Sequence, residues 1–486
     1  MKTIIVGAGI GGMVTALYER MAGNEVVMFE SKARLGGRLA YHERGEYRVD
    51  EGPTVVLLPN MIKEILNEIG LADRVEFVQI DPLYPLHFPD GSNFLKWSNK
   101  ENQKKEIEKH FPGESGGFDE YMDDMKERYF DGKASFLDHA FLQRRAFWTI
   151  GNIKTLIKLK AYQSVRKQSK KYFKSIRLQE AFALQTLYIG GSPEQTPAIY
   201  SLVPFSEHEH GIWYIKGGYA KLAEVLAEAL EERGVEVRTH SSVSEIVTEA
   251  NEATGCIVNG EEVNGDRIVL NGEFPAAEKL MPENSKKTYK PSSGCLLFYF
   301  GLNKPLNTAH VHNFYIGESL DKHMNDLFVE HKLSDDPAFY VFNPSLIDET
   351  LAPEGHGVAY VLVPVPSADK ISRKEYLTYA EKIKKLLIER TDAQLNEKIE
   401  WEHIRTPHEA KLDGLYQGGS FGIAPTLFQS GVFRPQVKPF SYNNVYAVGA
   451  SVHPGGGIPI VMHGAKVLSK ILRSETKEEL MDIKEN

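Results

Sequence analysis

The stretch TIIVGAGIGG, residues 3–12, predicts a short apolar strand that runs directly into a glycine-rich turn. The segment Met13–Met21 has a helix-forming composition, and Glu25–Phe29 predicts a second strand that ends at Glu30. Strand, glycine-rich turn, helix, strand and acid, in this order, make up the βαβ unit that binds dinucleotides. A glycine-rich turn without a ligand would require neither the helix nor the acid, so we favour nucleotide binding.

The glycines of this turn have separate physical roles. Gly7 permits the tight turn, Gly9 lets a pyrophosphate approach the backbone, and Gly12 lets the helix pack closely on the strand. The free N–H groups at the helix N-terminus attract phosphate, and the acid accepts hydrogen bonds from the adenosine ribose. The residues predicted to hold the nucleotide are Gly7, Ala8, Gly9, Gly11, Gly12 and Glu30.

The residues that follow narrow the choice of cofactor. Ser31–Arg38 resembles the ExxxxxGGR extension of the two-dinucleotide-binding-domain flavoproteins, which include amine oxidases, protoporphyrinogen oxidases and carotenoid desaturases. The resemblance implies FAD, with the extension along its pyrophosphate and ribityl chain. It also implies a Gly-Pro turn near the flavin and a valine whose backbone contacts the adenine. The residues it adds are Gly36, Gly37, Arg38, Pro53, Thr54 and Val243.

A second glycine-rich turn lies near the other end of the chain. The run VYAVGASVHPGGGIPIVMHGAK, residues 445–466, predicts a strand, a turn with three adjacent glycines and a helix that begins near Pro459. This arrangement presents another helix N-terminus, and the glycines allow a flat ring to contact the backbone. The run resembles the carotenoid desaturase signature that holds the flavin, although other relatives have an acid at Ala450. The residues implied are Gly449, Ala450, Gly456, Gly457 and Ile458.

The resemblance to carotenoid desaturases extends along nearly the whole chain. Segments 351–364 and 421–436 are similar to the diapophytoene desaturases of the bacterial C30 branch, and segment 185–190 is similar to that branch as a whole. The triple glycine and Pro291–Gly294 instead favour the diaponeurosporene/diapolycopene oxygenases of the same branch. We expect a desaturase, with the oxygenase as the alternative.

The resemblance implies dehydrogenation of a long apolar C30 polyene, as in 4,4'-diapophytoene desaturases. A hydride would leave a C–H bond for the flavin, and loss of a proton from the neighbouring carbon would extend the conjugation. Because only one nucleotide fingerprint is present, we expect quinone or oxygen to accept the electrons. No residue stands out as the catalytic base. His453 is a weak candidate, because its position in the flavin-proximal turn favours a role in the turn itself.

Two other functions remain compatible with the sequence. The same fold occurs in prenyl-binding escort proteins that do no redox chemistry, but the intact glycines and Glu30 favour FAD binding. An amine oxidase usually needs an aromatic cage beside the flavin, and the sequence identifies none. His208 and His210 lie two positions apart in an expected polar loop without a third ligand, so no metal site is predicted.

The composition is that of an ordinary water-soluble protein. The chain has 486 residues, 42% of them hydrophobic, and its length predicts two or three domains. No long uncharged apolar run occurs and the first strand begins at residue 3, so we expect neither a spanning helix nor a signal peptide. Cys256 and Cys295 are isolated, which favours a reducing, cytoplasmic environment. The net charge of −9 argues against nucleic-acid binding.

One segment departs from this acidic balance. Arg144–Arg177 contains eleven Lys and Arg residues, and no Asp or Glu occurs between Asp138 and Glu180. Bulky apolar side chains are interleaved with these basic residues. The pattern predicts a surface that binds a membrane, with the protein peripheral on its inner, cytoplasmic face. The alternatives are a helical lid whose charges face water and a nucleic-acid groove, which no accompanying motif supports.

These patterns together predict an α/β fold. A Rossmann-like FAD-binding domain of the two-dinucleotide-binding-domain type is interleaved with an α+β substrate domain and a basic helical lid or membrane-association region. The predicted divisions are FAD-binding segments 1–75, 206–290 and 439–475, a lid and substrate segment 76–205, a substrate segment 291–438, and a charged tail 476–486.

Overall fold

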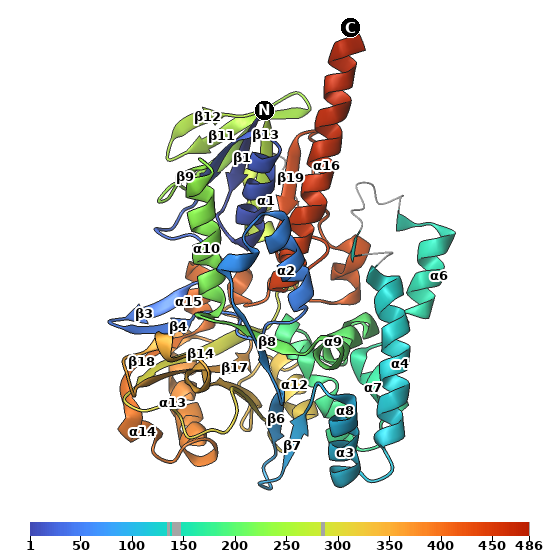
Figure 1. Cartoon of the computed structure of the whole chain (residues 1–486), viewed down its shortest axis with the longest axis vertical. Coiled ribbons are helices and arrows are strands. Elements are labelled where there is room, and N and C mark those ends of the chain that lie inside the picture. The colour runs from blue at the N-terminus through green and yellow to red at the C-terminus, as the bar shows by residue number, and fades with distance from the viewer. Residues whose placement is uncertain (134–136, 139–146, 283–286, 486) are drawn as a thin grey trace.

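A computed structural model describes residues 1–133, 137–138, 147–282 and 287–485, so the predicted basic residues Arg144 and Arg145 lie outside the described ranges. The upper part of the molecule in Figure 1 is built on five parallel strands in the order β19-β13-β1-β2-β9. Their bounds are β1 (Lys2–Val6), β2 (Glu25–Phe29), β9 (Glu236–Arg238), β13 (Arg267–Asn271) and β19 (Val445–Val448). We call this the nucleotide part.

Helices cover this sheet and explain why its strands are apolar. Helix α1 (Ile10–Met21) packs against both α10 (Gly218–Glu232) and α16 (Ile458–Glu485), and α16 also contacts α2 (Pro59–Glu68). A three-stranded antiparallel sheet packs on β13 through its middle strand. Its strands are β10 (Val243–Glu249), β11 (Glu252–Val258) and β12 (Glu261–Asn264).

The lower part of Figure 1 contains a seven-stranded mixed sheet in the order β18-β14-β17-β16-β15-β6-β7. Its pairings are antiparallel except for β15 with β6. The bounds are β6 (Tyr84–His87), β7 (Asn93–Lys96), β14 (Gly294–Leu302), β15 (His312–Tyr315), β16 (Phe339–Phe342), β17 (Gly357–Val365) and β18 (Ile399–Arg405). We call this sheet and the helices around it the substrate part.

Side chains alternate across this sheet, as the two-residue period of a strand requires. On β14, Leu296 and Phe298 share a core with Tyr376 of α13 (Arg373–Arg390), whereas Leu297 and Tyr299 belong to the core on the opposite side. That opposite side faces the helices α3 (Lys100–His110), α4 (Ser115–Gly132), α7 (Val165–Tyr172), α8 (Ile176–Ala181), α9 (Leu202–His210) and the 3₁₀ helix η3 (Leu184–Ile189). Helix α6 (Ile150–Lys158) contacts α4.

Short elements connect the two parts. Strands β3 and β4 form an antiparallel ribbon between the two parts, and β5 pairs with β8 in a second two-stranded sheet. Further short helices flank the large sheets. The bounds are β3 (Tyr41–Arg44), β4 (Tyr47–Asp50), β5 (Phe77–Ile80), β8 (Ile212–Ile215), α11 (Phe274–Ala277), α12 (Leu320–Phe328), α14 (Leu395–Lys398) and α15 (Pro407–Leu412). Each large sheet draws strands from distant segments of the chain, so the predicted interleaved α/β fold class is confirmed.

One local prediction differs from the structure. His208 and His210 lie in helix α9 and not in a polar loop, and His208 is buried with its Nδ1 2.7 Å from the Trp97 carbonyl oxygen. The burial of apolar neighbours such as Phe205 drives this segment inward. Helix α16 continues to Glu485 and so includes the described part of the charged tail 476–486.

Candidate functional site

The first glycine-rich turn joins β1 to α1 and is held by hydrogen bonds from its neighbours. The Gly7 N–H donates to the Phe29 carbonyl at 2.7 Å, and the Asn271 side chain donates to the Gly7 carbonyl at 2.8 Å. Gly7 has a φ of +95°, and a Cβ there would lie 1.9 Å from the Asn271 carbonyl oxygen. A Cβ on Gly12 would lie 2.4 Å from the Gly7 carbonyl oxygen. Both positions therefore require glycine.

Glu30 braces this turn from the end of β2. Its Oε2 accepts the Ala8 N–H at 2.9 Å, and its Oε1 accepts the Lys32 N–H at 2.9 Å. The Glu30 carboxylate thus holds the turn in place and also lines the cavity next to it. The Ala8 N–H is directed at Glu30, so this backbone donor is already satisfied within the protein.

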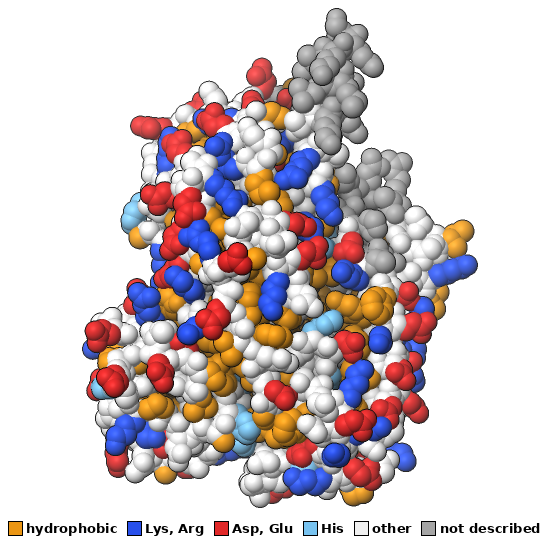
Figure 2. All heavy atoms as spheres, in the orientation of Figure 1, with side chains coloured by type: hydrophobic (Ala, Val, Ile, Leu, Met, Phe, Trp, Pro, Cys, Tyr) orange, Lys and Arg blue, Asp and Glu red, His pale blue; other side chains and the backbone are white. Residues whose placement is uncertain are grey.

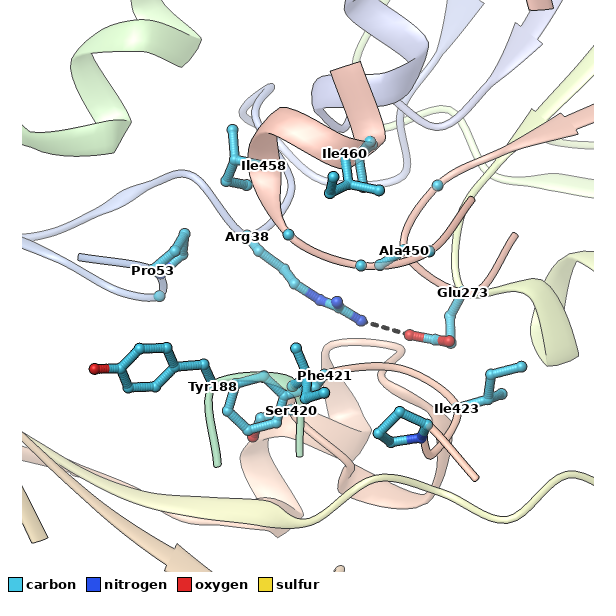
Figure 3. A pocket seen from close by; sticks show the side chains of 18 of the residues that line it. Arg38, Pro53, Tyr188, Glu273, Ser420, Phe421, Ile423, Ala450, Ile458 and Ile460 are labelled. Atoms are coloured by element: carbon cyan, nitrogen blue, oxygen red, sulfur yellow. Dashed lines mark hydrogen bonds and ion pairs between the residues drawn. The ribbon is translucent and has the colours of Figure 1, made fainter. Parts of the chain in front are cut away.

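The Gly36-Gly37-Arg38 extension lies directly against the first turn. The Gly36 N–H donates to the Ala8 carbonyl at 2.8 Å, and a Cβ on Gly37 would lie 3.2 Å from the Gly9 Cα. Arg38 reaches across the cavity, and its guanidinium donates to the Glu273 carboxylate at 2.5 Å (Figure 3). The Glu273 side chain is buried, so this pair places one balanced positive and negative charge at the floor of the site.

The second glycine-rich turn precedes α16 and presents the helix N-terminus to the same space. Gly456 has no positive φ, and a Cβ there would meet no protein atom closer than 3.7 Å. Neither backbone conformation nor internal packing therefore explains this glycine. A flat group lying against the backbone does explain it, because a side chain would occupy the same space.

One cavity of about 1230 Å³ connects these pieces. It runs from the first glycine-rich turn past Arg38 and the second turn into a chamber lined by aromatic and aliphatic side chains (Figure 3). The chamber wall includes Tyr188, Phe314, Tyr340 and Phe421. A polar strip and an apolar chamber thus share one continuous space.

The predicted site residues, more than 400 positions apart in sequence, converge on this cavity. Ala8 and Gly12 lie behind the wall. His453 lines the cavity and is buried, and its N–H donates to the Pro435 carbonyl at 2.7 Å. The predicted residues that line the cavity are Gly7, Gly9, Gly11, Glu30, Gly36, Gly37, Arg38, Pro53, Thr54, Val243, Gly449, Ala450, His453, Gly456, Gly457 and Ile458.

These residues fit an FAD molecule. The N-terminus of α1 carries no acidic residue in its first turn, so its positive dipole end is available to a pyrophosphate. The N-terminus of α16 offers the same stabilisation to negative charge on a flavin, and the open glycine at residue 456 leaves room for the ring. Among the described residues, no three His, Cys, Asp or Glu side chains gather as metal ligands.

Several cavity residues were not predicted as site residues. The Tyr340 hydroxyl lies 2.8 Å from the Thr54 Oγ1 and 2.6 Å from the His312 Nδ1, and it ties the flavin-proximal turn to the substrate sheet. Burial lowers the pKa of His312 to about 3, so this imidazole is neutral. Tyr188 and Phe421 lie in segments that carried the family resemblance, which was the available signal for them.

Comparisons with known proteins agree with this geometry. A family model described as flavin containing amine oxidoreductase matches residues 10–465. The 4,4'-diapolycopen-4-al dehydrogenase of Metabacillus indicus is 52% identical over 98% of this chain and 97% of its own. The 4,4'-diapophytoene desaturase (4,4'-diaponeurosporene-forming) of Staphylococcus haemolyticus is 31% identical over 97% of this chain and 98% of its own.

Solved structures share the fold at low sequence identity. A putrescine oxidase bound to putrescine has a TM-score of 0.65 at 14% identity and covers 98% of this chain and 99% of its own. Cyclohexylamine oxidase from Brevibacterium oxydans has a TM-score of 0.61 at 13% identity, with 97% and 99% covered. At these identities the likeness concerns the fold alone.

Proposed function

Because this chain belongs to the flavin-containing amine oxidoreductases, within their carotenoid desaturase branch, we propose that it dehydrogenates a long apolar C30 polyene. The family resemblance and the FAD dependence predicted from the motifs are confirmed, and the chain is an FAD-dependent oxidoreductase. The escort-protein alternative is therefore not favoured.

The observation that carries the proposal is the continuity of the cavity. The strip that fits FAD opens directly into an apolar chamber, so a long hydrocarbon can lie beside the cofactor without passing through water. The Cys295 thiol lines the chamber, and burial raises its pKa to about 12, so it remains protonated. The chamber thus suits an uncharged chain.

The chain's own residues bind and orient the reactants. When bound, FAD supplies the hydride acceptor. The two helix N-termini and the Arg38–Glu273 pair hold the polar strip, while Tyr188 and Phe421 face it from the chamber. Their bulk excludes water and holds a substrate C–H bond against the cofactor side, which is the orientation that hydride transfer requires.

Expression in cells that make the C30 precursor tests this proposal. Extracted pigment should contain new conjugated double bonds, seen as an absorption shift to longer wavelength. A Gly7→Ala variant provides the matched control because it removes the cofactor site. An unchanged precursor pool with the flavin-loaded protein would reject the proposal.

A second reaction is favoured by one observation, which is the 52% identity to a protein named as an aldehyde dehydrogenase. Relatives named as diapophytoene desaturases are 29–31% identical. The second candidate is oxidation at the terminal carbon of an already conjugated chain. Supplying the purified protein separately with the precursor, the conjugated hydrocarbon and its terminal aldehyde distinguishes the two reactions by which substrate is consumed.

We also propose quinone or oxygen as the electron acceptor, because a single nucleotide fingerprint supports a single dinucleotide site. Reduced protein prepared without oxygen should be reoxidised by a soluble quinone or by air. Reoxidation by NAD⁺ or NADP⁺ at a comparable rate would contradict this proposal.

We propose that the chamber opens onto a membrane surface. Trp148, Ile153, Ile157 and Phe428 both line the cavity and expose much of their surface, with Ile157 60% and Phe428 73% exposed. Hydrophobic side chains gather with basic ones over α6 at the right-hand edge of Figure 2. None of the described helices combines the length and apolar character needed to cross a bilayer. We call these four residues the chamber mouth.

The basic charges of this region are only partly available to lipid. Lys158 pairs with Glu127 and Asp131, each at 2.6 Å, and Arg166 is buried beside Asp321. We therefore expect the apolar side chains of the chamber mouth to contribute more to membrane binding than the basic side chains do. Flotation of the purified protein with vesicles rich in anionic lipid tests it, and recovery only in the lipid-free fraction would reject it.

A further inference from the structure

An aromatic wall faces the polar strip across the cavity. Tyr188 and Phe421 line the chamber opposite Pro53 and Ile458 (Figure 3). A Cβ on Gly190 would lie 2.6 Å from the Phe421 ring, so glycine at this position lets Phe421 pack against the segment that carries Tyr188. Two aromatic rings therefore border the place where a substrate would meet the cofactor.

A buried carboxylate stands behind this wall. Glu207 of α9 is fully buried and accepts hydrogen bonds from the Tyr84 hydroxyl at 2.8 Å and the Gln185 side chain at 3.1 Å. Burial raises the pKa of Glu207 to about 7, while the Lys96 charge and the Tyr84 and Tyr188 hydroxyls act in the opposite direction. The carboxylate is thus held in a polar cluster that the mechanism above does not use.

The positive partner of this cluster points elsewhere. The Lys96 ammonium lies 3.7 Å from the centroid of the Phe182 ring and donates to the Ala181 carbonyl at 3.3 Å. The pKa of Tyr188 lies well above its usual value because of burial first and the Glu207 charge second. The Glu207 charge therefore acts on the Tyr188 hydroxyl.

We propose that this wall stabilises positive charge on the substrate, with Tyr188 as the catalytic residue and Glu207 as a positioning residue acting through it. The inference rests on the proposed dehydrogenation. In that reaction a bound flavin would accept the hydrogen together with both electrons of the C–H bond, and the substrate carbon left beside Tyr188 would be cationic. A proton would then leave the neighbouring carbon for a water molecule that enters through the solvent-exposed chamber mouth, and the electron pair of that C–H bond would form the new double bond.

The physical basis is electrostatic. Aromatic faces attract cations most strongly where water is excluded, and preorganised charge is most effective in a dry site. The Glu207 carboxylate, held by Tyr84 and Gln185 behind the wall, would add negative potential at the Tyr188 ring. In the apolar chamber this stabilisation replaces the hydration that a cation would have in water.

Binding of a cation mimic tests the inference without turnover. The probes are a long dialkyl-dimethylammonium ion, with its charge at the middle of the chain, and the uncharged dialkyl-dimethylsilane of the same shape. Both are delivered in neutral vesicles, and binding is followed by quenching of flavin fluorescence. We expect the wild-type protein to bind the cation about 10-fold more tightly than the silane.

Matched variants locate the preference. Tyr188→Leu and Glu207→Gln should each reduce the ratio of cation to silane affinity severalfold with little change in silane binding, while Tyr188→Phe, which keeps the ring, should lose less. Tyr172→Leu and Glu180→Gln are controls, because both side chains are buried in the substrate part and neither lines the cavity. Flavin content checks that each variant is folded.

The pH dependence provides a measurement on the wild-type protein. The titratable groups that act on Glu207 or feel its charge are Lys96, Tyr84, Tyr121 and Tyr188, and His208 is the next residue of α9. Burial lowers the pKa of Lys96 to about 8 and holds that of His208 well below its usual value, and burial raises the pKa values of the tyrosines. Protonation of Glu207 is therefore the main change between pH 7.5 and 6, and the cation preference should fall over this range.

Equal affinity of the wild-type protein for the two probes would overturn the inference. So would a ratio that stays within about twofold of wild type in both Tyr188→Leu and Glu207→Gln. These binding results do not depend on which polyene is oxidised. Failure of the proposed function would appear separately, as an unchanged pigment precursor with a protein that still prefers the cation.

Discussion

The nucleotide part and the substrate part of this chain solve different physical problems. In the nucleotide part, backbone atoms form the predicted binding surface, and glycines at residues 7, 12 and 456 leave space that a side chain would fill. In the substrate part, side chains form the cavity wall, and aromatic rings such as Tyr188 and Tyr340 line the chamber. At these glycines the nucleotide part cannot accommodate even one added carbon atom. The substrate part depends on many apolar contacts acting together.

This difference teaches where each kind of change should act. A cofactor with fixed shape and charge requires fixed backbone geometry, so the loss of one glycine should abolish binding. A flexible hydrocarbon requires only an apolar space of suitable shape, so single changes in the chamber should produce graded effects. The following predictions test this contrast, from the largest expected effect to the smallest.

The largest effect is expected from Gly7→Ala. The added Cβ would lie 1.9 Å from the Asn271 carbonyl oxygen in a left-handed conformation, so the turn must open and flavin should be lost. Gly23→Ala is the control, because its φ is +85° and nothing lies within 4 Å of the new atom. It should retain flavin and lose about 1 kcal/mol of stability. Flavin absorbance per mole of protein measures flavin binding in both variants. A Gly7→Ala protein that still binds flavin would contradict the proposed difference between the two parts.

The same contrast explains what sequence could and could not predict. The turns at residues 7–12 and 455–457 were recognisable because the glycines of each turn are neighbours in the sequence. The aromatic wall and Glu207 were not, because tertiary packing brings η3, α9 and β6 together from separate segments. His208 was misplaced for the same reason, since a polar segment became a buried helix. The hydrogen bond from the Ala8 N–H to Glu30 was not predicted, because the two residues are 22 positions apart and nothing local indicates the contact.

In the substrate part, the largest effect is expected at the chamber mouth. Ile153→Asp combined with Ile157→Asp should weaken binding to anionic vesicles by about 100-fold, because two apolar side chains would no longer leave water and two negative charges would be added. Ile176→Asp is the control, since Ile176 is 64% exposed but does not line the cavity. Vesicle cosedimentation measures the binding, and equal losses in both proteins would show that the mouth is not special.

A smaller and reversible effect should follow from His312. Burial lowers its pKa to about 3, so the folded protein keeps it neutral while the unfolded chain protonates it near pH 6.5. This group therefore costs stability as the pH falls below about 6.5, by about 1.4 kcal/mol between pH 7.5 and 5.5. His312→Phe should flatten the pH dependence of unfolding in urea by that amount. An unchanged slope would show that the imidazole is hydrated or charged in the folded state.

The smallest effect separates free charges from paired ones on α6. Lys154 is exposed and has no ion pair among the described residues, whereas two carboxylates hold the Lys158 ammonium at 2.6 Å. Lys154→Gln should cost about 1 kcal/mol of binding to anionic vesicles at low salt, and Lys158→Gln should cost less. Both effects should shrink as salt rises, because the charges are screened. Equal losses would mean that lipid displaces the acidic partners of Lys158, and the charged run would then act as a whole alongside the apolar mouth.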